Sequence, residues 1–321
     1  MDQPVIVKIM HIYYPILATV GVPANLITIL ILSRGKCNLS KCITRYLLAM
    51  AVADLLVLIF EVILYQIKEA YFSHSFLNYT PICSLNLALL YASIDCSVWL
   101  TVFFTIDRFI AICSQSLRTK YCTPRNAAVI IAVVCFISIV ENAPIFLIYE
   151  PREIIDNVPW SCYVKSSFYV LTIWAAFFWF ETILTPSTPF VLILVLNAMT
   201  IRYIVLSNRV RSELKGLRNH TDPEIENRRK SIILLLVISG SFITLWMVFF
   251  ICFICVHFTD AQFLKANYED SFTIAEQSGY MLRCLSSCAN TVIYAVSQRR
   301  FREELNALTK QPLHIVTKLF K

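Results

Sequence analysis

Seven long runs of mainly apolar residues alternate with short polar segments along the chain. Each run contains the roughly 20 residues that a helix needs to cross a bilayer. The hydrophobic share of the sequence is 58% and the charged share is 15%, which leaves too little polar surface for a water-soluble domain. The pattern therefore predicts an all-α membrane protein, a bundle of seven transmembrane helices. The runs cover residues 11–33, 44–67, 83–113, 126–149, 168–206, 229–257 and 270–296.

The basic residues indicate which ends of the helices face the cytosol. Most of the 28 Lys and Arg residues follow the first, third, fifth and seventh runs. Positively charged loops stay in the cytosol, so we expect the amino terminus outside the cell and the tail inside. This topology, with attraction to the anionic inner leaflet, accounts for the net charge of +7 without a nucleic-acid partner.

Charged and polar residues recur at particular places in these apolar helices. The inner end of the third helix carries Asp107-Arg108-Phe109, and charges within a membrane are costly and usually functional. The other motifs are Gly21-x-x-x-Asn25, Leu48-Ala49-Met50-Ala51-Val52-Ala53-Asp54, Cys83 at the outer end of the third helix, Phe242-x-x-x-Trp246, and Asn290-Thr291-Val292-Ile293-Tyr294. In their order, spacing and sidedness, these motifs resemble the rhodopsin-like (class A) family of G-protein-coupled receptors.

The resemblance extends over almost all of the chain and implies its organisation. Residues 1–297 would form the seven-transmembrane receptor domain. Residues 298–321 would form a short amphipathic helix lying on the membrane and a short cytoplasmic tail. The runs Val22-Pro23-Ala24-Asn25-Leu26 and Ser297-Gln298-Arg299-Arg300-Phe301 further resemble an orphan branch of the family, in which some members respond to aromatic amino acids.

The resemblance implies a receptor of the plasma membrane rather than an enzyme. Binding of an extracellular small ligand or short peptide would favour one helix arrangement, and a cytosolic heterotrimeric G protein would favour the same one. No cofactor is expected apart from an allosteric Na⁺. Light sensors of this fold need a Lys in the seventh helix for a Schiff base, and residues 270–296 contain none.

The resemblance assigns a G-protein switch to five residues. Asp107 would pair with Arg108 at rest, and Arg108 would enter the G-protein site when the sixth helix swings outward. Asn290, Tyr294 and Asn197 complete the predicted switch, although Asn197 stands where a Tyr usually helps to hold the active state. The alternative is an interfacial Arg108 that extends to lipid phosphate.

A lone carboxyl group, Asp54, lies among apolar residues of the second helix. Ser97, Ser287 and Asn290 would converge on it, with Asn25 of the first helix completing the polar core. Asp54, Ser97 and Asn290 are the expected ligands of a Na⁺ ion. The alternative is a hydrogen-bonded network around a protonated Asp54, because an unpaired buried charge is costly.

A charged pair is predicted one level farther out. Glu61 lies seven residues outward of Asp54, and Arg283 lies seven residues outward of Asn290, about two helical turns in each case. The resemblance implies that Asp54 and Asn290 meet and that their helices are neighbours. Glu61 and Arg283 should therefore lie at one depth and pair. Two interpretations stay open: a permanent structural salt bridge, or a pair that opens to a zwitterionic ligand.

Other residues complete the predicted ligand pocket. Phe242 and Trp246 lie on one face of the sixth helix, where aromatic residues are ordinarily part of the core. The resemblance implies that they form a toggle whose Trp floors the pocket. Glu181 is a second candidate for binding an ammonium group. Leu90 stands where amine receptors keep an Asp, which disfavours a monoamine ligand. Tyr91 and Tyr280 complete the expected lining, which suits a small aromatic amino acid or a short peptide.

Three residues are expected to be modified outside the cell. The implied topology makes Cys83 and Cys162 extracellular, and an oxidising exterior favours a disulfide between them. Asn78 belongs to an Asn-x-Thr glycosylation site on the same side; the alternative is a skipped site, because it lies close to the membrane.

Two other function classes stay open. Charges inside the membrane would also suit a transporter of a small charged solute; they belong to Glu61, Asp95, Glu141, Glu181 and Arg283. Transporters usually show internal repeats, and none is evident in this sequence. The other option is a non-signalling decoy receptor of the same fold, because Val248 and Thr291 stand where the family usually has Pro.

Overall fold

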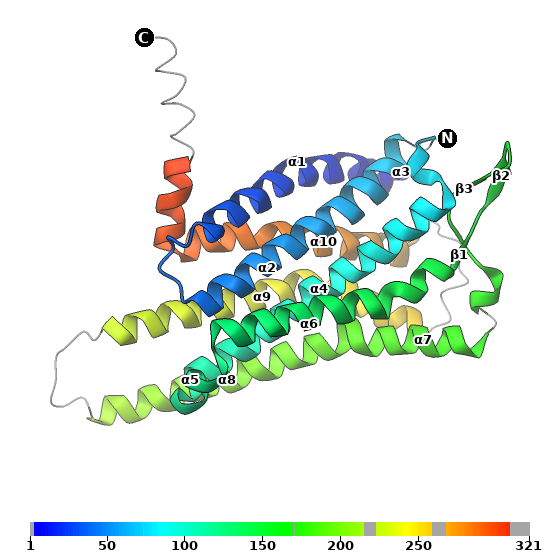
Figure 1. Cartoon of the computed structure of the whole chain (residues 1–321). Coiled ribbons are helices and arrows are strands. Elements are labelled where there is room, and N and C mark those ends of the chain that lie inside the picture. The colour runs from blue at the N-terminus through cyan, green and yellow to red at the C-terminus, as the bar shows by residue number, and fades with distance from the viewer. Residues whose placement is uncertain (1–2, 73, 170, 215–222, 259–267, 309–321) are drawn as a thin grey trace, which may run out of the picture.

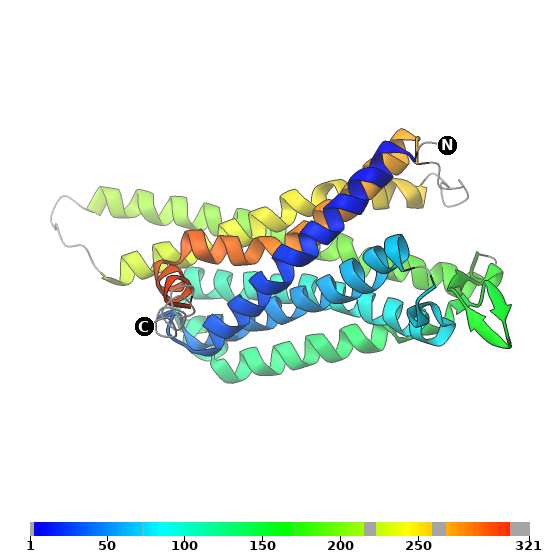
Figure 2. The same ribbon diagram turned by 90° about the horizontal axis from the view of Figure 1, so that it is seen from above.

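The computed structural model describes residues 3–308 apart from 73, 170, 215–222 and 259–267. Figure 1 shows a bundle of long helices lying side by side, and Figure 2 shows the same bundle from above. The β-strands and the start of α1 lie at one end of the bundle, while α5 and the final described helix lie at the other.

Each of the seven predicted runs contains helix. Six helices in the described part of the chain are long and apolar enough to cross a membrane. The seventh long helix, α10, is more polar and packs against α9 and α1. In chain order the elements of the seven spans are α1 (Val5–Ser33), α2 (Lys41–Val57) with η1 (Leu58–Ile67) and α3 (Lys68–Tyr71), α4 (Thr80–Cys113), α6 (Pro124–Asn142) with η3 (Ala143–Leu147), α7 (Thr172–Thr182) with η5 (Ile183–Ser187) and α8 (Thr188–Leu214), α9 (Pro223–Phe258), and α10 (Ser271–Ser297).

Local sequence explains where several helices begin. The hydroxyl of Ser40 accepts a hydrogen bond from the Ile43 amide at the start of α2. Thr123 caps α6 in the same way, and Pro124 occupies its first turn, where no amide hydrogen is needed. Asp270 caps α10 by accepting from the amide of Phe272 at 3.1 Å.

The second and fifth spans contain π-helical segments on the side that carries the strands. The second span is wound as a π-helix over Leu58–Ile67, the segment that contains Glu61. The fifth span is broken at Thr185, whose φ of −144° and ψ of 116° are extended. The next residue is Pro186, which disfavours helical geometry in the residue before it. Such distortions are frequent at functional sites in membrane helices.

The loop between the fourth and fifth spans contains two short antiparallel strand pairs. β1 (Tyr149–Glu150) pairs with β4 (Tyr163–Val164), and β2 (Glu153–Ile155) pairs with β3 (Val158–Trp160). Asp156 and Asn157 join β2 to β3 with φ values of 50° and 63°. Both are residue types that tolerate left-handed backbone in a two-residue hairpin turn. The sequence analysis did not predict this hairpin, although the Asp-Asn pair was its signal.

Three further short helices lie among the described residues outside the spans: η2 (Phe76–Asn78), α5 (Gln115–Tyr121) and η4 (Ser166–Tyr169). A last helix covers 299–308, where the amphipathic helix is expected. Its Phe301 is buried and its ring packs edge-on against Tyr294, with 5.9 Å between the centroids. Residues 309–321 of the expected tail lie outside the described residues.

Candidate functional site

An ion pair joins the second and seventh spans inside the bundle. Nη2 of Arg283 on α10 contacts Oε1 of Glu61 on η1, and both side chains are buried. The pairing that the helical spacing predicts is therefore confirmed, even though the intervening residues are wound as a π-helix. Whether the pair meets a ligand stays a prediction.

Aromatic rings surround the guanidinium group of this pair. The Arg283 Cζ atom lies 4.7 Å from the ring centroid of Phe249, 5.2 Å from that of Tyr280 and 5.9 Å from that of Trp246. These are cation–π distances. A Cβ atom at Gly279 would lie 2.9 Å from the Phe249 backbone, so the glycine allows α9 and α10 to approach this closely. Phe249 was not predicted, although it lies three residues after Trp246 on the same helix.

The ion pair retains hydrogen-bonding capacity. Within the described part of the chain, Oε2 of Glu61 and Nε of Arg283 are buried and have no hydrogen-bond partner. Buried polar groups are normally paired, so two unpaired ones at one place need an explanation. A ligand with one donor and one acceptor would satisfy both groups.

The other predicted pocket residues lie in different surroundings. Leu90 is buried in the apolar cluster around Trp246. Tyr91 is 41% exposed. Glu181 interacts electrostatically with Asp95 of α4, which in turn accepts a hydrogen bond from Asn142 at 2.6 Å. The structure therefore places Glu181 in a second acidic group that the sequence analysis did not assemble.

The predicted polar core forms around Asp54. Its Oδ1 accepts a hydrogen bond from the Ser97 hydroxyl at 2.6 Å, and its Oδ2 accepts one from the Asn290 amide at 2.7 Å. A cavity of about 10 Å³ borders these residues, Ser287 and Trp246. This volume matches roughly one water-sized occupant. The carboxylate and the two serine hydroxyls are hard oxygen ligands, so the donor set fits a small cation.

Asn25 contributes to a different contact from the one expected. Its amide donates to the backbone oxygens of Gly21 at 3.0 Å and of Ser287 at 2.9 Å. It therefore ties α1 to α10 beside the polar core. One turn farther along α1, the buried hydroxyls of Thr28 and Thr291 lie 2.8 Å apart. Thr291, which replaces a proline of the family motif, thus provides a second polar link between the same helices.

The two toggle residues connect the ion pair with the polar core. The rings of Phe242 and Trp246 are stacked with their centroids 5.0 Å apart, and both side chains are buried. Trp246 faces the Arg283 guanidinium and also borders the cavity beside Asp54. Trp246 therefore contacts both the guanidinium group and the cavity of the polar core.

At the other end of the bundle, Arg108 pairs with its sequence neighbour Asp107, and both are buried. The thiol of Cys42 donates to Oδ1 of Asp107 at 3.2 Å. The thiol of Cys122 donates to the backbone oxygen of Asp107 at 3.4 Å. Neither cysteine was predicted here, because a thiol gives little signal in an apolar sequence.

The remaining predicted switch residues have different hydrogen-bonding surroundings in the described part of the chain. Asn197 of α8 donates to the Ser239 hydroxyl of α9 at 2.8 Å. The hydroxyl of Tyr294 is buried and has no hydrogen-bond partner among the described residues. Asn290 donates to Asp54 and is therefore part of the polar core.

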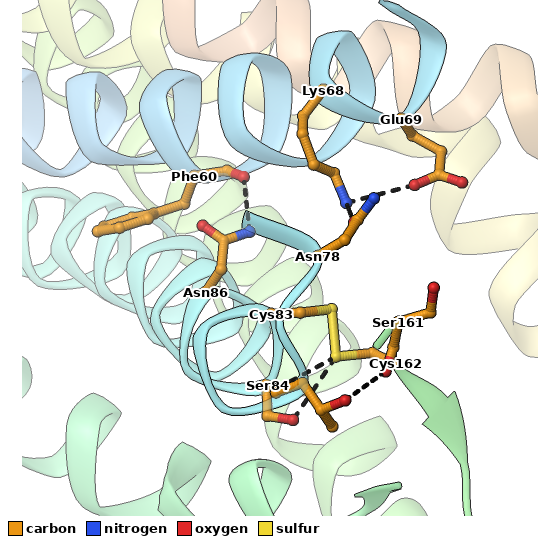
Figure 3. The surroundings of a disulfide bond; sticks show 10 residues. Phe60, Lys68, Glu69, Asn78, Cys83, Ser84, Asn86, Ser161 and Cys162 are labelled. Carbon is orange, nitrogen blue, oxygen red and sulfur yellow. Dashed lines mark hydrogen bonds and ion pairs between the residues drawn. A yellow bond between two sulfur atoms is a disulfide. The ribbon is translucent and has the colours of Figure 1, made fainter. Parts of the chain in front are cut away.

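A disulfide joins Cys83 at the start of α4 to Cys162 in the hairpin loop, as predicted (Figure 3). Their Cα atoms are 6.1 Å apart. Asn78 lies beside it and is buried, and its Oδ1 accepts a hydrogen bond from Lys68. Its backbone oxygen accepts from the Ser161 amide at 2.7 Å. Glycosylation of Asn78 stays a prediction. It would require the side-chain amide of Asn78 to leave its buried position.

The chain is similar to known receptors over nearly its whole length. A family model described as 7 transmembrane receptor (rhodopsin family) matches residues 24–294. The galanin receptor 2a of Danio rerio is 20% identical over 303 residues, which are 92% of this chain and 76% of that protein. The N-arachidonyl glycine receptor of Bos taurus is 22% identical, with 91% and 81% covered. The C-C chemokine receptor type 1 of Macaca fascicularis is 22% identical, with 96% and 81% covered.

Proposed function

The chain belongs to the rhodopsin family of seven-transmembrane receptors, and from this premise we propose how it receives and transmits a signal. It is a G-protein-coupled receptor and not an enzyme, and these relatives lend no support to the transporter and decoy alternatives. In our proposal it lies in the plasma membrane with the hairpin and amino terminus outside. The Asp107–Arg108 end then faces the cytosol and a heterotrimeric G protein.

The Glu61–Arg283 pair, with its unused donor and acceptor inside an aromatic cage, carries the ligand proposal. A ligand carboxylate would bind the Arg283 guanidinium, and a ligand ammonium would bind Glu61. An aromatic side chain would stack within the cage of Trp246, Phe249 and Tyr280. The proposed ligand is therefore a small aromatic amino acid or a short peptide, in keeping with the resemblance to an orphan branch.

Transmission follows the chain of contacts inward. When a ligand draws Arg283 away from Glu61, the guanidinium no longer holds the same face of Trp246. The shift of Trp246 and Phe242 then disturbs the small cavity beside Asp54. A helix arrangement in which Arg108 leaves Asp107 and meets the G protein is favoured at the cytosolic end. Ligand and G protein stabilise the same arrangement, which is the thermodynamic basis of the coupling.

Charge exchange tests the ligand role. The comparison uses Glu61→Gln, Arg283→Gln and the double variant Glu61→Arg with Arg283→Glu, each measured for surface expression and for G-protein activation by aromatic amino acids. Our proposal expects the double variant to restore expression but not the response. Recovery of both would make the pair purely structural. If Glu61→Gln and Arg283→Gln both show wild-type expression and response, the pair does not form the ligand site.

A bound Na⁺ would be held by Asp54, Ser97 and Asn290, and it would favour the resting arrangement by occupying the cavity beside Trp246. The test is the ligand affinity at different Na⁺ concentrations, with K⁺ keeping the ionic strength constant. Wild-type affinity should fall as Na⁺ rises, and Asp54→Asn should be insensitive. If the wild type does not respond to Na⁺, the hydrogen-bonded network around Asp54 stands without the ion.

A further inference from the structure

A crevice between η1 and the outer end of α4 plays no part in the signalling path proposed above. Its volume is about 140 Å³, and Phe60, Leu64, Ile82 and Leu89 line it together with Lys68 and Asn86. The lining is therefore mainly apolar with one cationic group. Figure 3 shows Lys68 and Asn86 near the disulfide, where the second span lies against α4.

The crevice opens toward the surroundings of the bundle. Leu85, which also lines it, is 51% exposed, whereas Leu87 on the same helix is buried. α4 therefore turns Leu87 inward and Leu85 outward. In a seven-helix receptor the outward surface at this depth meets lipid, so acyl chains have direct access to the crevice.

Lys68 is a buried cation with an exposed counterion. The residue is 5% exposed, and its Nζ donates to Oδ1 of Asn78. Its acidic partner is Glu69, with 3.3 Å between Nζ and Oε2, but the Glu69 side chain is 68% exposed. Exposed carboxylates contribute little to ion pairs, whereas a buried ammonium group needs an anion nearby. A ligand carboxylate could therefore replace Glu69 at little cost.

Asn86, which also lines the crevice, can form further hydrogen bonds. Its amide nitrogen donates to the Phe60 backbone oxygen at 3.3 Å, near the long limit for such a bond. In the described part of the chain its buried Oδ1 has no hydrogen-bond partner. This amide can bind the head of a ligand through a water molecule.

We propose that the crevice binds a single-chain lipid carboxylate that enters from the bilayer. The carboxylate replaces Glu69 at Lys68, and the acyl chain lies along Phe60, Leu64 and Leu89. The volume is below the roughly 300–1,000 Å³ of sites that enclose a whole small molecule, which suits one chain whose far end stays in lipid. The proposed topology puts Lys68 in the outer leaflet. Anionic phospholipids are concentrated in the cytoplasmic leaflet, so a lipid acid is the better source of the charge.

Photolabelling of the full-length receptor in neutral phosphatidylcholine nanodiscs tests this site. The probes are a long-chain fatty acid with a photoreactive diazirine and the fatty alcohol with the same chain. Peptide mapping should find several-fold more label from the acid than from the alcohol in segments 60–68 and 82–89. Lys68→Met should abolish this preference, and Leu85→Trp, which fills the crevice, should lower labelling by both probes.

Glu69→Gln is the control variant that should leave the fold unchanged, because the Glu69 side chain is exposed. It removes the competing carboxylate and should increase labelling by the acid while leaving the alcohol unchanged. Equal labelling by acid and alcohol in the wild type would overturn the proposal. So would unchanged acid labelling in Glu69→Gln, or in a well-folded Lys68→Met. The readout needs no G protein, so its failure leaves the proposed signalling function unaffected.

Discussion

Two buried ion pairs at opposite ends of the bundle contain the same chemical groups but join different things. Glu61 and Arg283 are 222 residues apart in sequence and belong to the second and seventh spans. Asp107 and Arg108 are neighbours on one helix. The outer ion pair therefore joins two helices directly, whereas both members of the inner ion pair belong to α4.

This difference suits the two pairs to different tasks. Breaking either pair leaves a charge in a poorly solvated place. The outer pair opens only if helices separate or another charged group takes over. The inner pair can open when the Arg108 side chain rotates, because both of its members lie on one helix. We infer that the outer pair mainly stabilises the bundle and the inner pair mainly sets its signalling state.

The largest effect should come from stranding one member of the outer pair. Arg283→Met leaves Glu61 buried without a cation and should lower the free energy of unfolding by about 3–5 kcal/mol. Surface expression and the thermal unfolding midpoint in detergent are the measurements. Adding Glu61→Met should restore most of the loss, because both charges are then gone. Wild-type stability of the single variant would contradict the role assigned to this pair.

The inner pair should behave in the opposite way. Arg108→Ala should abolish nucleotide exchange on the G protein, and it should lower surface expression less than Arg283→Met, because the Cys42 thiol still donates to the Asp107 carboxylate. Arg118→Ala, which changes an exposed basic residue of α5 nearby, is the control and should have little effect. Poor expression of Arg108→Ala with a normal signal per receptor would show that the inner pair stabilises the bundle and does not set the signalling state.

A smaller effect is expected from the thiol that contacts Asp107. Cys42→Ala removes the hydrogen bond to Oδ1, so the carboxylate is less firmly positioned beside Arg108. Basal nucleotide exchange should rise about 2- to 5-fold, equivalent to the ~0.5–1 kcal/mol of an ordinary hydrogen bond. Cys122→Ala is the matched control, because that thiol donates to the backbone oxygen of Asp107 at 3.4 Å. An equal rise in both variants would exclude a specific role for Cys42.

The smallest effect concerns the uncharged link between α1 and α10. Thr28→Val leaves the Thr291 hydroxyl unpaired and should destabilise the receptor by ~0.6 kcal/mol, typical of polar contacts between membrane helices. The double variant Thr28→Val with Thr291→Val should recover most of this loss. Thermal unfolding measures both. A loss as large as that of Arg283→Met would show that charge is not what distinguishes the outer pair.

The sequence predicted those features that membrane burial makes costly to arrange otherwise. Seven helices follow from seven apolar runs, because backbone groups in lipid must be paired within a helix. The Glu61–Arg283 contact follows from helical period and opposite charge, once the resemblance makes the second and seventh helices neighbours. The hairpin of β2 and β3 was missed because its strands are short and lie outside the apolar runs. The π-helical winding over Leu58–Ile67 left no recognisable pattern either.

Side-chain partners that depend on which helix faces meet could not be predicted. Phe249 is one of many aromatic residues, and only the packing of α9 against α10 brings it to Arg283. Asn197 was assigned to the switch by position, but its amide is bound to Ser239. Cys42 gave no signal, because the chain has 12 cysteines and most of them are scattered among the apolar runs.

The disulfide between Cys83 and Cys162 also bears on how the protein is made. The chain between these cysteines crosses the membrane along α4 and returns along α6. Both thiols reach the oxidising compartment only if the two helices insert in opposite directions. A chain that misinserts α6 keeps the thiols on different sides and cannot close the bridge. The disulfide therefore forms only in chains whose α4 and α6 are both correctly inserted in the membrane.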